Sequence, residues 1–536
     1  MQTISTTAPP TWEPASPRRE PTYAQRGLVA SAHQFASAAG LDVLSRGGNA
    51  VDAAIAAAAV MMAARPWLGH LGGDAFMLLH HAPSGATIAL NGSGAAPAAA
   101  TLERYQALGE IPESGLLAAS VPGVVHLWGV ALERFGSRPL GELLQPAIEY
   151  AEIGVQIASQ FQRALASTDL AVAGFVASGG NALEISDILR QPGLANTLRR
   201  IGEYGPDEFY AGELTDLMVH YAQTHNGLFT HDDFAAHQTE VVAPLSITYR
   251  GYTVYEQPAP SQGIIVLLAL KILEQFDLAA LGHASAATTH LLVEALKLGF
   301  EDVVHHLGDP RFVDPPYAHL LSDEHARAQA ARIDLHAARP TVFPAEVHKD
   351  TTYLCTADAD GTMVSYIQSL FAGCGVVLGD TGVWMNNRMR GFNLQPGHPN
   401  CLSPGKRPMH TLNEYLVRRD GETVLVGGTP GGHWQVQTNL QALTAILDFG
   451  LDVQQAIEAP QFAMGVQLQP GDPTLNIDPR FGAATLAALR DLGHPLNVTE
   501  PWGVGGNVHL IARDPATGRY TGASEVRWGG GSALGR

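Results

Sequence analysis

The chain has 536 residues, of which 46% are hydrophobic and 15% are charged, and it carries a formal net charge of -19 at pH 7. This composition is typical of a globular protein with a large core, and the negative charge argues against nucleic acid or an anionic membrane as the main partner. The three cysteines, Cys355, Cys374 and Cys401, show neither a CxxC pair nor zinc-type spacing. Such a sparse, odd set predicts reduced thiols in a reducing compartment, so we expect a cytoplasmic protein.

The N-terminal quarter begins with a segment that predicts no fixed structure. Residues 1–26 are rich in proline and polar residues and contain no apolar stretch typical of a signal peptide, which indicates a flexible tail. Helical spacing follows at residues 36–48, and Asn49 caps a second helix at 51–64 that is apolar almost all round. Its apolar run is too short to cross a bilayer. A glycine-rich loop then leads to two predicted strands, at 76–80 and 87–91.

Helices dominate the middle of the chain, and hairpins dominate the last third. Residues 102–217 are predicted to be mainly helical, and a hairpin at 245–257 precedes helices at 263–276, 286–307 and 323–333. After a polar linker at 335–349, hairpins are predicted at 351–370 and 415–426, followed by a helix at 433–449 and strands at 508–512 and 522–525. Each of the two hairpins turns at an Asp-Gly pair, which is a strong hairpin signal. This order favours antiparallel sheets covered by helices, an α+β fold.

The start of the first late hairpin, Asp350-Thr351-Thr352-Tyr353, carries potential chemistry. By itself a Thr-Thr pair at this place is ordinary β-branched strand sequence. Cleavage of the Asp350–Thr351 bond, however, would place a hydroxyl nucleophile beside a free α-amine on the same residue. That amine, with a pKa of about 8, can act as the general base for the hydroxyl.

Several widely spaced motifs support this interpretation. They are Val29-Ala30-Ser31-Ala32-His33, Gly47-Gly48-Asn49-Ala50-Val51-Asp52-Ala53-Ala54, Leu71-Gly72-Gly73-Asp74-Ala75-Phe76, Ser120-Val121-Pro122-Gly123, Gly308-Asp309-Pro310-Arg311-Phe312-Val313, Asp350-Thr351-Thr352-Tyr353, Asn386-Asn387-Arg388-Met389, Lys406-Arg407-Pro408 and Pro430-Gly431-Gly432. No single motif is decisive, but together and in this order they identify a family. From about residue 27 to residue 527, the chain resembles the gamma-glutamyltranspeptidase family of N-terminal-nucleophile hydrolases.

The resemblance implies a four-layer αββα sandwich made as a proenzyme that cuts itself between Asp350 and Thr351. A large subunit, residues 27–350 after the tail, and a small subunit, residues 351–536, would remain one intertwined unit. Thr351 would be the nucleophile, and Gly431 and Gly432 would form the oxyanion hole, where glycine lets backbone N–H groups approach closely. Taken alone, these glycines also fit an ordinary strand-to-helix turn. Ser369 falls where the family carries a threonine that bonds the nucleophile, although a solvent-facing serine is the simpler alternative.

Departures from the family pattern concern the acyl group of the substrate. Ser93 stands where gamma-glutamyl enzymes carry an arginine for the α-carboxylate, and Gly391 stands where they carry an aspartate for the α-amine. An ammonium group buried without a carboxylate partner is costly. The added charge of Arg388 and Arg390 favours an acyl group with a carboxylate and no amine, unless these arginines point to solvent.

Further substrate contacts are predicted for Asn387 and for the hydroxyl of Thr411. With these departures, the chain resembles a branch of the family that includes cephalosporin and glutaryl acylases and an oxamate amidohydrolase. Neither an HExxH motif nor a compelling Asp/His set is present, so we expect no metal and no cofactor.

The leading hypothesis is a threonine amidohydrolase that cleaves a small amide with an acidic acyl group, with water or an amine as the acyl acceptor. One alternative keeps the mechanism but uses a gamma-glutamyl donor such as glutathione. A second alternative is an uncut, non-catalytic relative with a binding role. The sequence leaves the oligomeric state open, with a dimer of large–small pairs as one option.

Overall fold

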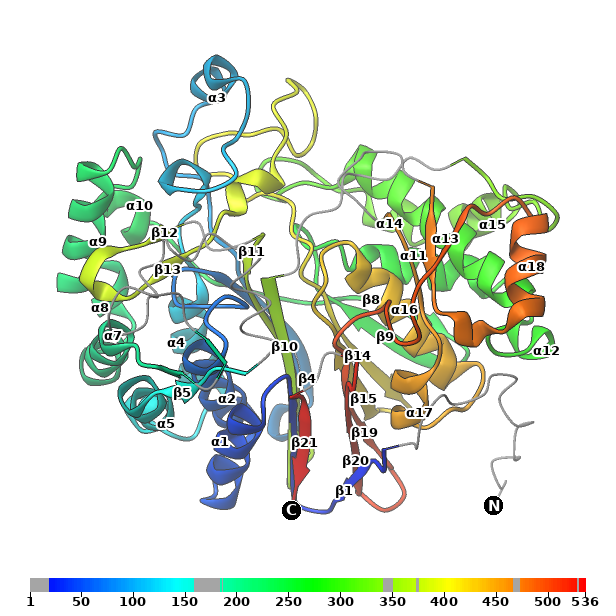
Figure 1. The fold of residues 1–536 in the computed structure, drawn as a ribbon, viewed down its shortest axis with the longest axis horizontal. Helices are drawn as coiled ribbons and strands as arrows, with labels where there is room; N and C mark the ends of the chain where they lie inside the picture. The colour runs from blue at the N-terminus through cyan, green and yellow to red at the C-terminus, as the bar shows by residue number, and fades with distance from the viewer. Residues whose placement is uncertain are drawn as a thin grey trace.

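Two seven-stranded sheets lie face to face at the centre of the molecule, and helices cover the outer face of each (Figure 1). The computed structural model describes residues 19–158, 184–185, 187–340, 350–372, 376–465, 473–527 and 530–536. The four layers confirm the αββα sandwich that the sequence predicts. Among the described residues, no helix is both long and apolar enough to cross a membrane.

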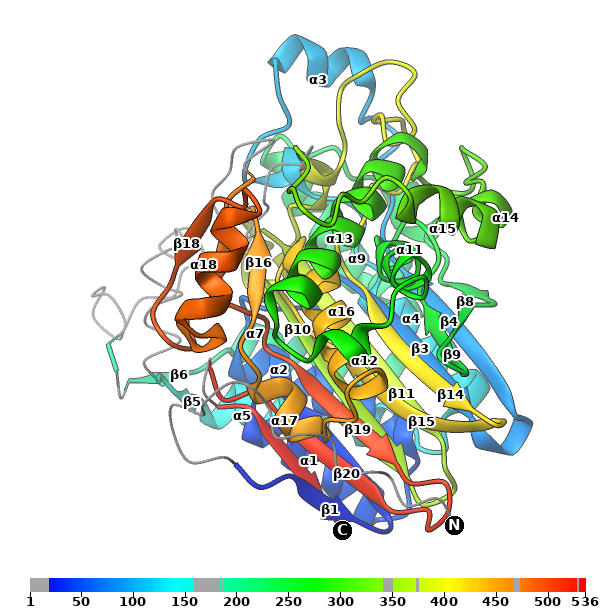
Figure 2. The same cartoon turned by 90° about the vertical axis from the view of Figure 1, so that its right-hand side faces the viewer.

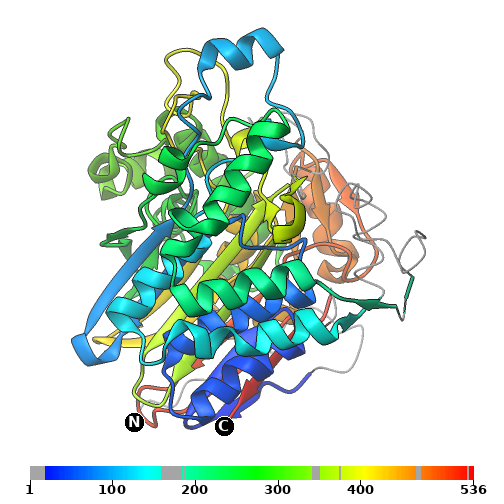
Figure 3. The same cartoon turned by 90° about the vertical axis from the view of Figure 1, so that its left-hand side faces the viewer.

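The first sheet holds the strand that begins at the Asp-Thr pair. Its strands, in spatial order, are β21 (Ser532–Gly535), β2 (Gly27–Ser31), β10 (Asp350–Asp358), β11 (Met363–Phe371), β3 (Asp74–His81), β4 (Ala86–Gly92) and β7 (Glu240–Val242). All neighbouring pairs are antiparallel. The outer face is covered by α1 (Gln34–Ser45), α2 (Ala50–Ala64), α4 (Val124–Phe135), α5 (Leu140–Ile153) and α7 (Pro192–Tyr204), as Figure 3 shows.

Helix α2 is the centre of this outer layer. Every one of its residues is buried, in agreement with its apolar sequence, and small alanine side chains let it pack closely against β10, β11 and the neighbouring helices. Asn49 and Asp52 form a reciprocal capping box that satisfies the first N–H groups of the helix.

The second sheet has the strand order β1 (Thr22–Ala24), β20 (Tyr520–Ser524), β19 (His509–Arg513), β15 (Glu422–Gly428), β14 (Glu414–Arg419), β9 (Tyr252–Glu256) and β8 (Leu245–Tyr249). Its outer face packs on α11 (Ile264–Leu273), α13 (Ala286–His306) and α16 (Trp434–Leu447), which face the viewer in Figure 2. Apolar side chains from both sheets, among them Phe76, Tyr353 and Leu416, fill the space between the two layers.

Shorter elements complete the chain. Within the described ranges, the remaining α-helices are α3 (Leu102–Leu108), α8 (Asp207–Tyr210), α9 (Glu213–Thr224), α10 (His231–Ala235), α12 (Leu278–Leu281), α14 (Tyr317–Leu320), α15 (Asp323–Ala330), α17 (Val453–Glu458) and α18 (Ala483–Asp491). Three small sheets pair β5 (Val155–Gln156) with β6 (Ile188–Leu189), β12 (Val376–Val377) with β13 (Trp384–Met385), and β16 (Phe462–Met464) with β17 (Leu475–Ile477) and β18 (Leu496–Val498).

Part of the predicted N-terminal tail, residues 22–24, is a strand. Residues 1–18 lie outside the described residues, but Thr22–Ala24 pair with β20, so ordered structure begins before residue 27. Cys355 is buried in the core as a free thiol and Cys401 is a second free thiol, whereas Cys374 lies outside the described residues.

Candidate active site

Thr351 lies near the start of β10, in the middle of the first sheet, with its side chain on the face that looks toward the second sheet. It is directly opposite Ser369 on β11, and the two hydroxyl oxygens are 2.9 Å apart. The strand pairing is irregular between Asp350 and Thr351, where the register shifts. The predicted contact between Thr351 and Ser369 is therefore present, and the predicted scissile bond lies at a break in the regular ladder.

Thr351 on β10, Ser369 on β11 and Asp74 on β3 form a row across three neighbouring strands. Asp74 is the cross-strand neighbour of Ser369, and its carboxylate accepts hydrogen bonds from the N–H of Gly94 at 2.7 Å and from Nε of Arg388 at 3.0 Å. Asp74 and Arg388 are both fully buried. Burial lowers the pKa of Arg388, but Asp74 opposes that shift, and an arginine stays protonated under ordinary conditions. The pair holds the guanidinium group of Arg388 close to the strands that carry the two hydroxyl groups.

The two terminal nitrogens of Arg388 are buried and have no hydrogen-bond partner among the described residues. Its guanidinium group lies over the ring of Phe371, 4.2 Å from the ring centre. Phe371 has a φ of 86°, which is unusual for a residue with a side chain. Since an unpaired buried donor is costly, two free terminal NH2 groups on a fixed guanidinium are suited to a carboxylate, which binds such a fork through both oxygens.

His410 reaches the same place from the second sheet's side. Both of its ring nitrogens are buried and unpaired within the described structure, and Nε2 is 4.0 Å from the carboxylate of Asp74. Burial and the nearby charges of Arg388 and Arg407 hold the pKa of His410 well below its usual value. A neutral imidazole at this point can donate one hydrogen bond to a ligand without adding a second charge.

The Gly431-Gly432 turn lies at the same end of the sandwich as Thr351. Strand β15 ends at Gly428, where an added Cβ atom would come within 2.5 Å of the ring of Tyr353, two residues after Thr351. Gly431 and Gly432 have φ values of 135° and 58°, which favour glycine.

Contacts behind the turn hold it in place. Gln262 donates from Nε2 to the carbonyl of Gly432 at 3.0 Å, and His433 bonds to Gln262 Oε1 at 2.9 Å. Neither glycine N–H bonds to another described residue. The turn thus has the free donors that an oxyanion hole requires, although that role stays a prediction.

Other predicted substrate contacts take part in internal bonds. The hydroxyl of Ser93 donates to Asn91 Oδ1 at 2.5 Å. The amide of Asn387 bonds to the carbonyls of Glu113 and Ala372 and accepts the N–H of Ala372. These two residues position the loops around Arg388.

The other residues that the sequence predicts for substrate binding or cleavage are Arg390, Thr411 and Asp350. Arg390 is partly exposed, 3.7 Å from a carboxylate oxygen of Glu113. Thr411 is buried beside His410, and its carbonyl accepts from Gln262 and Asn413. The Cα atom of Asp350 is paired with that of Phe371.

The sequence gives no role to two residues of this site, Asp74 and Phe371, and it leaves His410 open between a packed histidine and a ligand. Asp74 lies inside one of the family motifs, but its partner Arg388 is 314 positions away along the chain. The only sequence signal for a pairing would be the opposite charges in two motifs that already mark the same site.

Replacement of Ser369 by alanine should slow both self-cleavage and turnover by about 10- to 100-fold. The change removes the hydroxyl that bonds Thr351 and also leaves the N–H of Phe371 without its acceptor, 2.8 Å away, and each such bond contributes about 1 kcal/mol or more. Timed mass spectra would give the cleavage rate, and an amide assay the turnover. Ser369→Thr keeps the hydroxyl and should stay within a few fold of the wild type; equal rates for Ser369→Ala would contradict the role.

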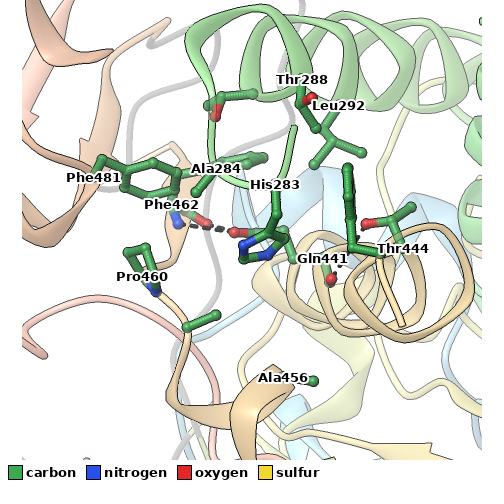
Figure 4. Close-up of a pocket in the computed structure, with 13 residues that line it drawn as sticks. His283, Ala284, Thr288, Leu292, Gln441, Thr444, Ala456, Pro460, Phe462 and Phe481 are labelled. Atoms are coloured by element: carbon green, nitrogen blue, oxygen red, sulfur yellow. Dashed lines mark hydrogen bonds between the residues drawn. The ribbon is translucent and has the colours of Figure 1, made fainter. Parts of the chain in front are cut away.

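A pocket shown in Figure 4 lies elsewhere in the molecule. It is formed by α13, α16 and the segment around Pro460, with Thr288, Gln441 and Phe481 among its lining residues. None of the residues grouped around Thr351 contributes to it. It is therefore not part of the candidate active site.

Comparison with known proteins gives a consistent family. The family model described as gamma-glutamyltranspeptidase matches residues 36–535. The chain is 38% identical to the glutathione hydrolase-like YwrD proenzyme of Bacillus subtilis over 88% of this chain and 91% of that protein. It is 34% identical to the oxamate amidohydrolase proenzyme of Klebsiella pneumoniae subsp. pneumoniae over 95% of this chain and 98% of that protein. The crystal structure of cephalosporin acylase from Bacillus halodurans superposes with a TM-score of 0.90 at 35% identity, covering 98% and 99% of the two chains.

Proposed function

Because this chain belongs to the gamma-glutamyltranspeptidase family and is therefore an amidohydrolase, we propose that it is a self-processing threonine hydrolase for small amides whose acyl part carries a carboxylate. The observation that carries this proposal is the buried guanidinium of Arg388, which has two free terminal NH2 groups and is joined through Asp74 to the strands that carry Ser369 and Thr351. Large and small subunits, residues 27–350 and 351–536, would arise from one precursor in the cytoplasm.

Maturation begins with the hydroxyl of Thr351. Its oxygen attacks the carbonyl carbon of Asp350, the C–N bond of that peptide breaks, and the nitrogen leaves as the α-amine of Thr351. The ester that joins Asp350 to the Thr351 oxygen is then hydrolysed by water. The irregular pairing between the two residues and the hydrogen bond between the hydroxyls of Thr351 and Ser369 support attack at this bond rather than at a regular ladder position.

Turnover uses the same oxygen with the newly formed amine as the base. The amine takes the proton of the Thr351 hydroxyl, the oxygen attacks the substrate amide, and the negative oxygen that develops is stabilised by the N–H groups of Gly431 and Gly432. The proton passes to the leaving amine as the C–N bond breaks. Water, or an acceptor amine, then attacks the acyl ester and restores free Thr351.

Selection of the acyl group rests on the charges around Arg388. A carboxylate on the acyl chain would pair with the free guanidinium N–H groups, with a hydrogen bond from His410. A gamma-glutamyl donor adds an ammonium group, which needs its own carboxylate. The nearby candidate, Asp74, already accepts hydrogen bonds from Arg388 and Gly94. The ammonium group would therefore gain little binding free energy from Asp74 while losing its hydration.

Three matched anilides test this selectivity. Glutaryl p-nitroanilide differs from the gamma-glutamyl compound only by lacking the amine, and butanoyl p-nitroanilide further lacks the carboxylate. We expect kcat/KM for the glutaryl compound to exceed that for the butanoyl compound by about 100-fold, because a desolvated charge pair is worth roughly 2–5 kcal/mol. It should exceed that for the gamma-glutamyl compound by at least about 10-fold.

Two other outcomes of these assays would each support one of the alternative functions. Preference for the gamma-glutamyl compound, with glutathione turned over as well, would replace the proposal by a gamma-glutamyl hydrolase or transferase. A chain that remains a single uncut species under denaturing mass spectrometry, and hydrolyses none of the three, would indicate a non-catalytic relative.

A further inference from the structure

A second group of chemically reactive side chains lies far from Thr351, on the helical layer over the second sheet. His290 and Glu294 belong to α13, and His494 lies just after α18, which packs on α13 (Figure 2). All three side chains are buried, and one nitrogen or oxygen atom of each lies within 4.8 Å of the others. The four-residue spacing on α13 places its two members on one face of the helix.

The atoms that face one another are metal-ligating atoms. Nδ1 of His290 and Nε2 of His494 are 2.8 Å apart, so one of these nitrogens donates a hydrogen bond to the lone pair of the other. On the other side of the His290 ring, Nε2 lies 2.8 Å from the carbonyl of Asp334. Since that carbonyl accepts the Nε2 proton, Nδ1 is the ring nitrogen of His290 that faces His494 and is available as a ligand atom. A metal-binding histidine is typically fixed by this kind of bond from its other ring nitrogen.

The carboxylate of Glu294 is held in a compatible way. Its Oε1 atom accepts from Nζ of Lys297 at 2.7 Å, and the N–H of Arg339 makes long contacts of 3.4 Å with Oε1 and 3.3 Å with Oε2. A carboxylate can bind a metal through one oxygen while a lysine bonds the other. Lys297 also donates to the carbonyl of Arg339 at 2.8 Å, so its ammonium group is shared between the carboxylate and this carbonyl.

We infer that His290, Glu294 and His494 form a binding site for one divalent transition-metal ion of the zinc class. Two imidazole nitrogens and one carboxylate oxygen are a usual three-ligand set for such ions, with water as the fourth ligand. Binding requires His494 to move its proton from Nε2 to Nδ1, so the ion takes the place of the proton between the two rings. The sequence predicts no such site because His494 is 204 positions from His290.

The site joins parts of the chain that self-cleavage would separate. His290 and Glu294 would belong to the large subunit, and His494 to the small one. The segment from Asp334 to Arg339, which contacts both α13 residues, also bonds to the carbonyl of Leu492 through the N–H of Ala338 at 2.7 Å. A bound ion would therefore fasten the last described part of the large subunit to the small subunit.

Cobalt titration of untagged, EDTA-treated protein tests this inference. Co²⁺ in such a site gives visible absorption bands, so we expect wild-type protein to saturate at one equivalent and Zn²⁺ to displace the cobalt. His494→Gln should bind at least about 100-fold more weakly, since loss of a group that merely orients a ligand already costs roughly 10–100-fold. Zn²⁺ should raise the melting temperature of the wild type and leave that of His494→Gln unchanged.

His306→Gln is the matched control, because His306 is an exposed histidine on the same helix; it should behave like the wild type. Absence of the cobalt bands in the wild type, or equal uptake by His494→Gln, would overturn the site. If His494→Gln fails to fold, Glu294→Gln carries the same expectation. Thr351→Ala should bind cobalt normally, so the result is independent of the proposed hydrolysis.

Discussion

Thr351→Ala is expected to leave the chain as a single uncut species and to lower amide hydrolysis by on the order of 10⁴-fold or more. The substitution removes the oxygen that attacks the Asp350 carbonyl, and without cleavage the α-amine that serves as the base never forms. Intact mass under denaturing conditions would show one species for the variant and two, divided between Asp350 and Thr351, for the wild type.

Two neighbouring changes make this result specific. Thr352→Ala removes the adjacent hydroxyl, which is also buried and has no hydrogen-bond partner among the described residues, and should leave cleavage and turnover within a few fold. Thr351→Ser keeps a nucleophile and should still mature, although more slowly. An active Thr351→Ala protein, or cleavage at another bond, would remove Thr351 from the mechanism.

Arg388→Met is expected to abolish the preference for acidic acyl groups. The methionine fills much of the same volume, but the acyl carboxylate loses its charged partner, which should lower kcat/KM for the glutaryl anilide by about 100-fold or more. Asp74 also loses its buried partner, so the variant should be less stable by roughly 3–5 kcal/mol. For that reason the decisive quantity is the ratio of glutaryl to butanoyl hydrolysis within one protein sample, which does not depend on the fraction folded.

Arg390→Met provides the comparison, since Arg390 is partly exposed and its nearby carboxylate is 3.7 Å away. Its glutaryl-to-butanoyl ratio should stay within about threefold of the wild-type ratio. Arg388→Lys should fall between the two, because lysine keeps the charge but lacks the planar pair of donors. An unchanged ratio in Arg388→Met would show that the acyl group is recognised elsewhere.

The sequence predicts the hairpins of this fold well because their signals are local. Asp420 and Gly421 adopt φ values of 52° and 83°, which matches the turn that an Asp-Gly pair favours. By contrast, β2 and β21 were not predicted. Gly27–Ser31 and Ser532–Gly535 consist largely of small residues with no alternating pattern, and they become strands through pairing with distant segments: β2 pairs with both β10 and β21, and β21 pairs with β2.

The candidate site likewise combines a local feature, which the sequence predicts, with tertiary contacts, which it does not predict. The pairing of Thr351 with Ser369 follows from one hairpin and from the family motifs, so the sequence is sufficient to predict it. The free donors of Arg388 depend on Asp74 occupying Nε alone, on the ring of Phe371 beneath the guanidinium, and on burial by the second sheet. These are tertiary contacts between distant segments, and no local pattern encodes them.

The strand order of the two sheets has a consequence for the lifetime of the mature enzyme. In the first sheet, β2 lies between β21 and β10, and in the second, β14 is paired with β9, so each sheet contains strands from before and from after residue 350. Once cut, the two chains cannot separate on dilution without breaking both sheets. Refolding from denaturant, which involves one molecule before the cut, afterwards requires two chains to meet. Before the cut, the unfolded chain could refold by itself. After the cut, the lifetime of the folded enzyme would be set by its rate of unfolding, that is, by kinetic stability.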